Sequence, residues 1–298
     1  MLKNLTELIQ MAKSSPQRKI AVASADDEQV LKALKSAMNE EIITPVLIGS
    51  KVEIEKVAST VGFDLNGVDI INTEDGVDTA RVAVELVRSG EARVLMKGRV
   101  STSQLLKAVL DKDIGLRTNK LLSHVALFQS PYYHKVFGVT DVAMNIAPDL
   151  NEKVQIIQNA TRVFHLLGIE NPKVAVAAAV EVVNPKMEAT LHAASLKEMN
   201  QNGELDGCIV DGPFALDIAF NREAALNKGI ESSVAGDCDI LLAPDIEAGN
   251  MFYKSLNFLG GAHSAAVIMG ATAPIVLTSR SDDDQSKLLS VALAACLG

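Results

Sequence analysis

Two stretches of the sequence place a cation beside hydroxyl groups where a strand is predicted to lead into a helix. In the first, the apolar run 92–98 ends at Lys97 and Gly98, and Thr102 and Ser103 follow after a short gap. Free N–H groups at a helix start, hydroxyl groups and an ammonium group together favour binding of an anion. The alternative is that a hydroxyl group in this stretch only caps the helix. Both interpretations remain open for this corner taken alone.

The second stretch follows the predicted strand 274–278 and contains Ser279, Arg280 and Asp282. A serine hydroxyl can donate to a developing oxyanion, and an arginine can hold phosphate through two parallel hydrogen bonds. A carboxylate at this position can act as a base or orient a thiol. Acidic residues also stabilise the start of a helix, which is a sufficient explanation for Asp283 and Asp284.

Weaker candidates lie at other predicted strand ends, where polar groups precede a helix. These candidates are Asn184 and Lys186, Asp211 with Asp217, and Glu247 with Asn250 and Lys254. For the two lysines a solvated helix face is a sufficient alternative. Arg117 and Lys107 are further candidates for an anion pocket.

Several familiar sites are missing from the sequence. It contains no GxSxG, GxxxxGK[ST] or GxGxxG pattern and no HExxH pair. Cys208, Cys238 and Cys296 lie far apart in apolar surroundings, which is typical of buried thiols and not of a disulfide framework or a metal site. These absences argue against a serine hydrolase, a P-loop kinase and a Rossmann dehydrogenase.

The charge balance limits the partners. The chain has 28 Lys and Arg residues against 37 Asp and Glu residues, a net charge of −9. Such a chain binds nucleic acid or an anionic membrane surface poorly, and an anionic substrate requires a local cationic pocket. The amphipathic start of the chain lacks the features of a signal peptide, and no apolar run is long enough for a membrane span. We expect a cytoplasmic protein.

The elements that must position these residues alternate between short apolar runs and longer helical patterns. Aromatic residues are only 4% of the chain and Trp is absent, which suits a buried parallel sheet covered by helices. The sequence predicts an α/β protein in which ligands bind beyond the carboxyl ends of the strands. Predicted strands lie at 19–25, 44–50, 92–98, 173–183 and 273–279, and predicted helices at 26–40, 150–168, 184–203, 213–229 and 282–298.

Two details of this pattern concern domains and helix starts. The stretch around 144–150 interrupts the alternation, and we expect the last helix to return to the first domain. This predicts a first domain of residues 1–145 and 258–298 and a second of residues 146–257. Pro185 and Pro213 are expected to lie at the starts of their helices, where proline is favoured.

Seven segments, taken in order, resemble the phosphate acetyl/butyryltransferase family. They are VLMKGRVSTSQLLKAVL, LSHVALF, TDVAMNIAP, VEVVNPKMEAT, GCIVDGPFALD, DILLAPDIEAGNMFYKSL and APIVLTSRSD. Each segment is modest evidence alone, whereas the ordered set covers nearly the whole chain and is specific.

The resemblance implies a two-domain fold like that of the isocitrate and isopropylmalate dehydrogenases, with the active site in the cleft between domains. It also implies a homo-oligomer. The implied reaction moves a short acyl group, with butanoyl preferred, between coenzyme A and inorganic phosphate: butanoyl-CoA plus phosphate gives CoA plus butanoyl phosphate. The implied reaction uses no metal or redox cofactor, because the CoA thioester is itself a substrate.

The resemblance also implies roles for residues. Ser279 and Arg280 match a functional pair of the acetyl-specific relatives, whereas the catalytic acid of those relatives falls here on Ser286, so Asp282 is assigned as the base with Asp284 as second choice. Lys107 takes the place of a phosphate-binding arginine. The phosphate-binding candidates are Lys97, Gly98, Thr102, Ser103 and Arg117. The candidates for binding of the acyl-CoA are Asn145, Asn184, Lys186, Asp211, Gly212, Glu247 and Asn250.

Other functions remain possible from the sequence. The same chemistry on acetyl-CoA, making a phosphate acetyltransferase, is the nearest. Transfer of long acyl chains from a carrier protein is another. An NAD-dependent dehydrogenase of the same fold would need metal-binding aspartates and a nucleotide loop, and neither is recognisable. A CoA-binding protein without catalytic activity is the last alternative.

Overall fold

The computed structural model describes residues 2, 4–278 and 282–298 and divides into two compact units. Unit 1 comprises Met1–Leu5 and Leu121–Ser264, and unit 2 comprises Thr6–Lys120 and Ala265–Gly298. These borders differ from those expected from the sequence, since residues 1–5, 121–145 and 258–264 belong with 146–257. The physical reason is strand pairing, because β6 (Phe137–Thr140) is hydrogen-bonded to β9 (Ile240–Leu242) inside the sheet of unit 1.

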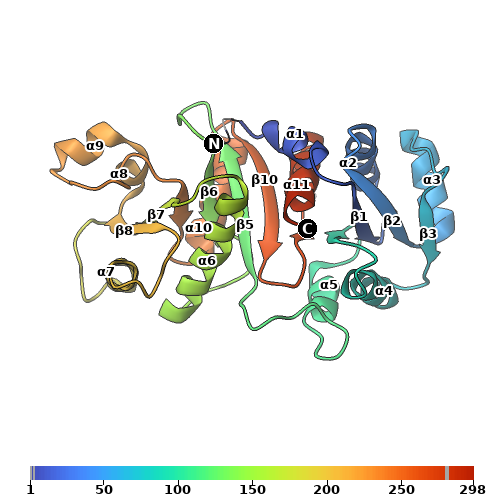
Figure 1. The fold of residues 1–298 in the computed structure, drawn as a ribbon, viewed down its shortest axis with the longest axis horizontal. Helices are drawn as coiled ribbons and strands as arrows, with labels where there is room; N and C mark the ends of the chain where they lie inside the picture. Colours follow the sequence, from blue (N-terminus) through green and yellow to red (C-terminus); the bar gives the residue numbers. More distant parts are fainter. Residues whose placement is uncertain (1, 3, 279–281) are drawn as a thin grey trace. The chain divides into compact units, whose positions relative to one another are not determined.

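The sheet of unit 2 has the strand order β3-β2-β1-β4-β11-β10. Figure 1 labels β3, β2, β1 and β10 of this series. All neighbouring strands are parallel except β10 and β11. Their bounds are β1 Arg18–Ala23, β2 Ile43–Gly49, β3 Asp69–Asn72, β4 Val94–Lys97, β10 His263–Met269, which belongs to unit 2 from Ala265 onward, and β11 Ile275–Val276. Val94 to Met96 are fully buried, as expected for a strand covered by helices on both faces.

Six helices surround this sheet in two groups. Helices α1, α11, α2 and α3 contact one another in series, and α4 contacts α5. Their bounds are α1 Glu7–Lys13, α2 Glu28–Asn39, α3 Lys51–Val61, α4 Gly76–Arg88, α5 Thr102–Val109 and α11 Asp284–Leu297. The predicted strands 19–25, 44–50 and 92–98 correspond to β1, β2 and β4, and the last predicted helix corresponds to α11 in unit 2.

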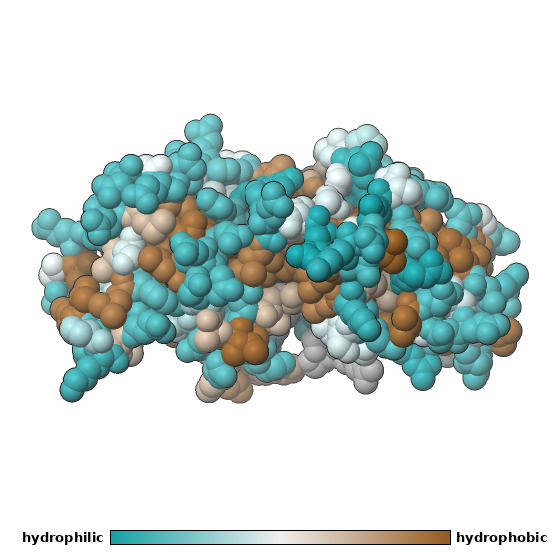
Figure 2. Space-filling model, turned by 90° about the horizontal axis from the view of Figure 1, so that it is seen from below, coloured by the Kyte–Doolittle hydropathy of each residue, from teal (hydrophilic) through white to brown (hydrophobic). Residues whose placement is uncertain are grey.

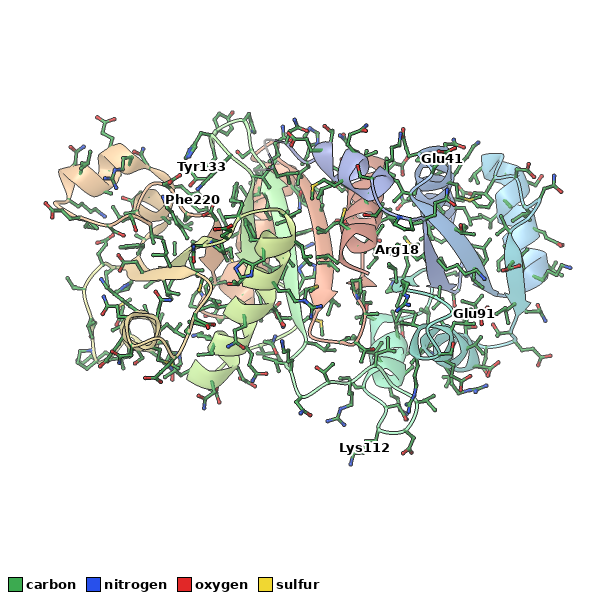
Figure 3. All side chains as sticks on the ribbon, in the orientation of Figure 1. Arg18, Glu41, Glu91, Lys112, Tyr133 and Phe220 are labelled. Carbon is green, nitrogen blue, oxygen red and sulfur yellow. The ribbon has the colours of Figure 1, made fainter. Side chains whose placement is uncertain are left out.

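Unit 1 contains the strand order β5-β6-β9-β7-β8, in which only β5 and β6 are antiparallel. Helices α6 and α7 contact each other, while α8 and α10 share a cluster of rings in which Phe220 lies 5.0 Å from Tyr133 between ring centroids (Figure 3). The remaining bounds are β5 Ser123–Gln129, β7 Lys173–Ala177, β8 Ile209–Phe214, α6 Leu150–Leu166, α7 Glu188–Gln201, α8 Leu216–Phe220, α9 Arg222–Asn227 and α10 Ile246–Phe258.

Three predictions for unit 1 were wrong. The predicted strand 173–183 ends at Ala177, and α7 begins at Glu188 instead of at Pro185. The side chain of Asn184 accepts a hydrogen bond from the backbone N–H of Lys186, which holds a turn before the helix. Pro213 lies in β8, where an edge strand tolerates proline, and the helix predicted at 213–229 is divided into α8 and α9.

An ion-pair network lies at the amino ends of three strands of unit 1. The ammonium group of Lys135 lies 2.7 Å from Asp239 Oδ1 and 2.9 Å from Asp237 Oδ1. Burial would raise the pKa of Asp237, but hydrogen bonds from Lys173, Lys135 and His134 hold that pKa well below its usual range. Asp239 is only 3% exposed, and its second oxygen accepts from the backbone N–H of Lys173 at 2.8 Å.

Replacing Asp239 by asparagine is expected to lower the free energy of unfolding by about 2 kcal/mol, because Lys135 loses one of two counter-charges in a buried position. Urea denaturation measures the change. The matched control is Asp69→Asn, which removes a 65% exposed partner of Lys19 and should change stability by less than about 1 kcal/mol. Equal effects of the two substitutions would show that burial does not strengthen the network.

One face of the molecule is mainly polar. Figure 2 shows a face covered largely by hydrophilic residues, with hydrophobic residues in small separate patches. Of the helices in the described part of the chain, none is both long and apolar enough to cross a bilayer.

Candidate functional site

The carboxyl end of β4 forms a tight corner with the end of β1. Gly98 donates its backbone N–H to Ala23 O at 2.8 Å, and Arg99 donates to Ser24 O at 2.7 Å. Lys97 is half-buried at the last position of β4, and its ammonium group lies 3.0 Å from Gly98 O. The two strand ends therefore hold the Lys97 backbone in one place, and the cation extends from a rigid base.

Gly98 is required by the close approach of the β1 backbone. A Cβ atom at this position would lie 2.0 Å from Ser24 O and 2.7 Å from Ala23 O. Both atoms belong to a backbone that is itself hydrogen-bonded to the corner, so neither can move aside easily. Ser24 has a φ of 56°, an uncommon value for a residue other than glycine. The corner is thus a specialised backbone conformation and not an ordinary strand end.

Helix α5 begins beside this corner with a capping box. The Ser101 side chain accepts from the backbone N–H of Gln104 at 3.2 Å, and the Gln104 side chain accepts from the backbone N–H of Ser101 at 3.3 Å. The capping interpretation of the hydroxyl cluster is therefore confirmed for Ser101. Thr102 and Ser103 are exposed in the first turn, and anion binding by their hydroxyl groups stays a prediction.

The register of β11 brings its carboxyl end next to Lys97. Val276 lies opposite Met96 in the parallel pairing, so the chain beyond Val276 passes Lys97. Ser279 and Arg280, the predicted catalytic pair, lie outside the described residues. The chain is described again from Asp282, which is half-buried and whose backbone oxygen accepts a hydrogen bond from the ammonium group of Lys287.

The neighbouring aspartates at the start of α11 have different structural roles. Asp283 caps the helix by accepting from the backbone N–H of Ser286 at 2.6 Å. Asp284 is exposed in the first turn, where its charge is favourable. Ser286, on which the family resemblance was expected to place the acid of the acetyl-specific relatives, is buried at 6% exposure.

The structure does not bring Arg117 to this corner. Arg117 lines a cavity of about 520 Å³ together with Arg93, which precedes the first residue of β4, whereas Lys97 is the last residue of that strand. Lys107 is exposed in the last turn of α5. A second cavity, of about 600 Å³, lies at the end of β1 and is lined mainly by acidic residues with Arg99, which disfavours phosphate there.

In unit 1 two of the predicted residues hold the loop that follows β6. The Asn145 amide donates to Leu122 O at 2.9 Å and to the Asp141 carboxylate at 2.5 Å. The Asn250 amide donates to Val142 O at 3.0 Å. A Cβ at Gly249 would lie 2.2 Å from Asp141 O, so α10 approaches this loop at a glycine. Both asparagine side chains are therefore committed to the loop.

The other candidates of unit 1 fall into two groups. Asp211 and Gly212 lie within β8 and not beyond its end, and Asp211 forms an ion pair with Lys197 at 2.7 Å. Asn184 shapes the turn before α7 as described above. Lys186 and Glu247 are exposed and remain candidates for contact with a ligand.

A buried lysine that was not among the candidates from the sequence lies near the start of α6. Lys153 in α6 is 3% exposed, and its ammonium group lies 2.9 Å from Nδ1 of His192 in α7. Burial lowers the pKa of Lys153, although the charge of Glu188 favours its protonated form. Burial, together with the Lys153 charge, also lowers the pKa of His192. The burial of Lys153 could have been expected from helical periodicity, because Lys153 lies three residues before Ile156 and therefore on the apolar face of α6.

The chain is similar to known proteins over nearly its whole length. The family model "Phosphate acetyl/butaryl transferase" matches residues 4–79 and 73–295. The chain is 46% identical over 295 residues to phosphate butyryltransferase of Clostridium acetobutylicum, covering 99% of this chain and 98% of that protein. It is 45% identical over 291 residues to phosphate acetyltransferase of Thermotoga maritima, covering 98% of each chain.

Solved structures confirm the fold class. A branched-chain phosphotransacylase from Enterococcus faecalis is 33% identical with a TM-score of 0.83, covering 94% of this chain and 98% of that one. A 4-hydroxythreonine-4-phosphate dehydrogenase from Burkholderia phymatum is 16% identical with a TM-score of 0.56, covering 95% of this chain and 98% of that one. At such low identity the second match shows the fold alone. The chain therefore has the expected α/β fold with mostly parallel strands, which dehydrogenases also use.

Proposed function

Because the chain belongs to the phosphate acetyl/butyryl transferase family, we propose that it moves a short acyl group, with butanoyl preferred, between coenzyme A and inorganic phosphate. The observation that carries this proposal is the identity of 46% to a phosphate butyryltransferase over 99% of the chain. The corner of β4 supports it, because Lys97 offers a cation on a rigid base beside the segment that leads to Ser279 and Arg280.

In the proposed reaction a phosphate oxygen attacks the thioester carbonyl carbon. The carbon–oxygen bond forms, the carbon–sulfur bond breaks, and its electron pair leaves on the sulfur of CoA. Lys97 and Arg280 neutralise and orient the phosphate, which converts an encounter of two molecules into a positioned step. Ser279 and nearby backbone N–H groups stabilise the oxyanion. Asp282 accepts the proton that the attacking phosphate loses and passes it to the departing sulfur, and in the reverse direction it accepts the thiol proton.

Unit 1 contributes in two ways under this proposal. Three asparagines hold loops of unit 1 in place, because their side chains form hydrogen bonds with backbone groups of that unit. They are Asn145, Asn184 and Asn250. Lys186 and Glu247 are exposed and are the better candidates for contact with acyl-CoA. A homo-oligomer is also proposed, following the family resemblance.

Phosphate-dependent thiol release tests the function. We expect free thiol to appear from butanoyl-CoA only when phosphate is added, because phosphate is the acyl acceptor. A colorimetric thiol assay measures the rate, and a series from acetyl-CoA to longer acyl-CoA substrates gives the acyl preference. Release at the same rate without phosphate would contradict the proposal, and faster release from acetyl-CoA would favour the acetyltransferase alternative.

Replacing Asp282 by asparagine is expected to lower the rate of thiol release about 100-fold, the lower range for loss of a general acid or base. The half-buried side chain keeps its size, so a urea midpoint that shows the variant is fully folded at the assay temperature separates loss of activity from loss of stability. Asp69→Asn serves as the control for removal of an exposed carboxylate. A large loss with Asp284→Asn and none with Asp282→Asn would assign the proton transfer to Asp284 instead.

A further inference from the structure

Unit 2 contains a cavity of about 520 Å³ at the amino ends of β4 and β11. Four basic residues line it: Arg88 from α4, Arg93 before β4, and Lys112 and Arg117 from the segment after α5. Figure 3 shows Lys112 on the loop that follows α5. We call this space the cationic cavity. Its volume lies within the range of small-molecule pockets, roughly 300–1,000 Å³.

The basic residues of the cationic cavity are poorly compensated. Asp111 is the one acidic side chain in its lining, which also includes Leu297 and Gly298 at the carboxyl end of α11. The Asp111 carboxylate already accepts from the backbone N–H groups of Asp113 and Ile114 at 2.8 and 3.0 Å. Arg88 donates to Asp113 O. Within residues 4–278 and 282–298, no ion pair or hydrogen bond engages the side chains of Arg93, Lys112 and Arg117.

This arrangement is unusual for the chain. The net charge is −9, and two other arginines of unit 2 form ion pairs, Arg81 with Asp78 and Glu85 and Arg99 with Asp26. Like charges gathered in a concave space repel one another. Binding of an anion would relieve this repulsion.

We propose that the cationic cavity binds a compact anion with two or more phosphate groups. Arginine holds phosphate through two parallel hydrogen bonds, and the cavity offers three arginines and one lysine. The lining contains no aromatic residue, so nothing there would stack on a nucleobase. These features favour a small polyphosphate anion over a nucleotide.

The cationic cavity is separate from the proposed reaction site. Arg93 and Lys97 lie at opposite ends of β4, four residues apart, which is roughly 13 Å along an extended strand. An anion in the cavity therefore does not occupy the position of the reacting phosphate. The inference does not rest on the proposed function.

Titration calorimetry with inorganic pyrophosphate on the whole chain tests the proposal. We expect saturable binding that weakens with added salt, and a Kd at least about tenfold higher in the double variant Arg93→Gln/Lys112→Gln. The single variant Arg93→Gln should show part of the loss. Arg162→Gln, which removes an exposed arginine of α6 in unit 1, is the matched control and should bind as the native chain does.

A further variant distinguishes the two possible sites. Lys97→Met should retain pyrophosphate binding, because that residue lies outside the cationic cavity. The proposal is overturned if the native chain does not bind pyrophosphate, if the Arg93 variants bind unchanged, or if Lys97→Met alone abolishes binding. Acyl transfer is not the readout, so failure here leaves the proposed reaction untouched.

Discussion

Replacing Lys97 by methionine is expected to lower the rate of phosphate-dependent thiol release from butanoyl-CoA about 1,000-fold, the upper range for loss of one preorganised charge-stabilising group. The reason is position. The backbone of Lys97 is paired with Ala23 of β1, and its neighbour Met96 is paired with Val276 of β11, so under the proposed function the ammonium group extends toward the phosphate from a fixed backbone. Initial rates at several phosphate concentrations measure the effect, and the KM for phosphate should rise as well.

Two comparisons make this result interpretable. Lys56→Met removes an exposed lysine of α3 that pairs with Glu53 of the same helix, and the rate should not change. Urea denaturation of Lys97→Met should give a midpoint close to that of the native chain. A rate within tenfold of the native value, with the fold intact, would remove Lys97 from the phosphate-binding site.

Replacing Gly98 by alanine is expected to lower the free energy of unfolding by about 3 kcal/mol and to abolish most activity, since overpacking against backbone cannot be relieved by a rotamer change. The added Cβ would lie 2.0 Å from Ser24 O. The corner can accept it only if the ends of β1 and β4 move apart, which breaks the hydrogen bond from Gly98 to Ala23. Urea denaturation and thiol release measure the two effects.

Gly76→Ala is the matched control for that experiment. Gly76 is the first residue of α4, and a Cβ there would lie 3.4 Å from the flexible side chain of Gln104, an ordinary contact. Alanine is also favoured over glycine in a helix, so stability should be unchanged or slightly higher. If Gly98→Ala were as stable as Gly76→Ala, the close approach at the corner would not be what requires glycine.

The sequence predicted the fold well where one local pattern decides the structure. The continuous apolar runs of β1, β2 and β4 and the acidic start of α2 were sufficient to place those elements, because burial on both faces and helix capping are local properties. Predictions were wrong where a side chain competes with the pattern. Asn184 forms a turn that delays α7, and Pro213 is accepted in β8 because that strand lies at an edge.

The candidate site was predicted in part. Lys97 and Gly98 could be recognised because the chain turns directly after an apolar strand. Arg117 could not be placed, because its position depends on how the segment after α5 returns to the amino end of β4. The contact between Lys153 in α6 and His192 in α7 joins residues that are 39 positions apart in the sequence, so no local pattern contains it.

The division of the chain also has a consequence for biosynthesis. The ribosome produces residues 6–120 first, yet unit 2 lacks β11, α11 and most of β10 until residues 265–298 have been made. Most of unit 1 is continuous from 121 to 264 and is complete before that point. The part of the protein that is synthesised first is therefore the last to become whole, in contrast to the usual order in which the N-terminal domain folds first. Until then the edge of β4 that pairs with β11 lacks its partner strand.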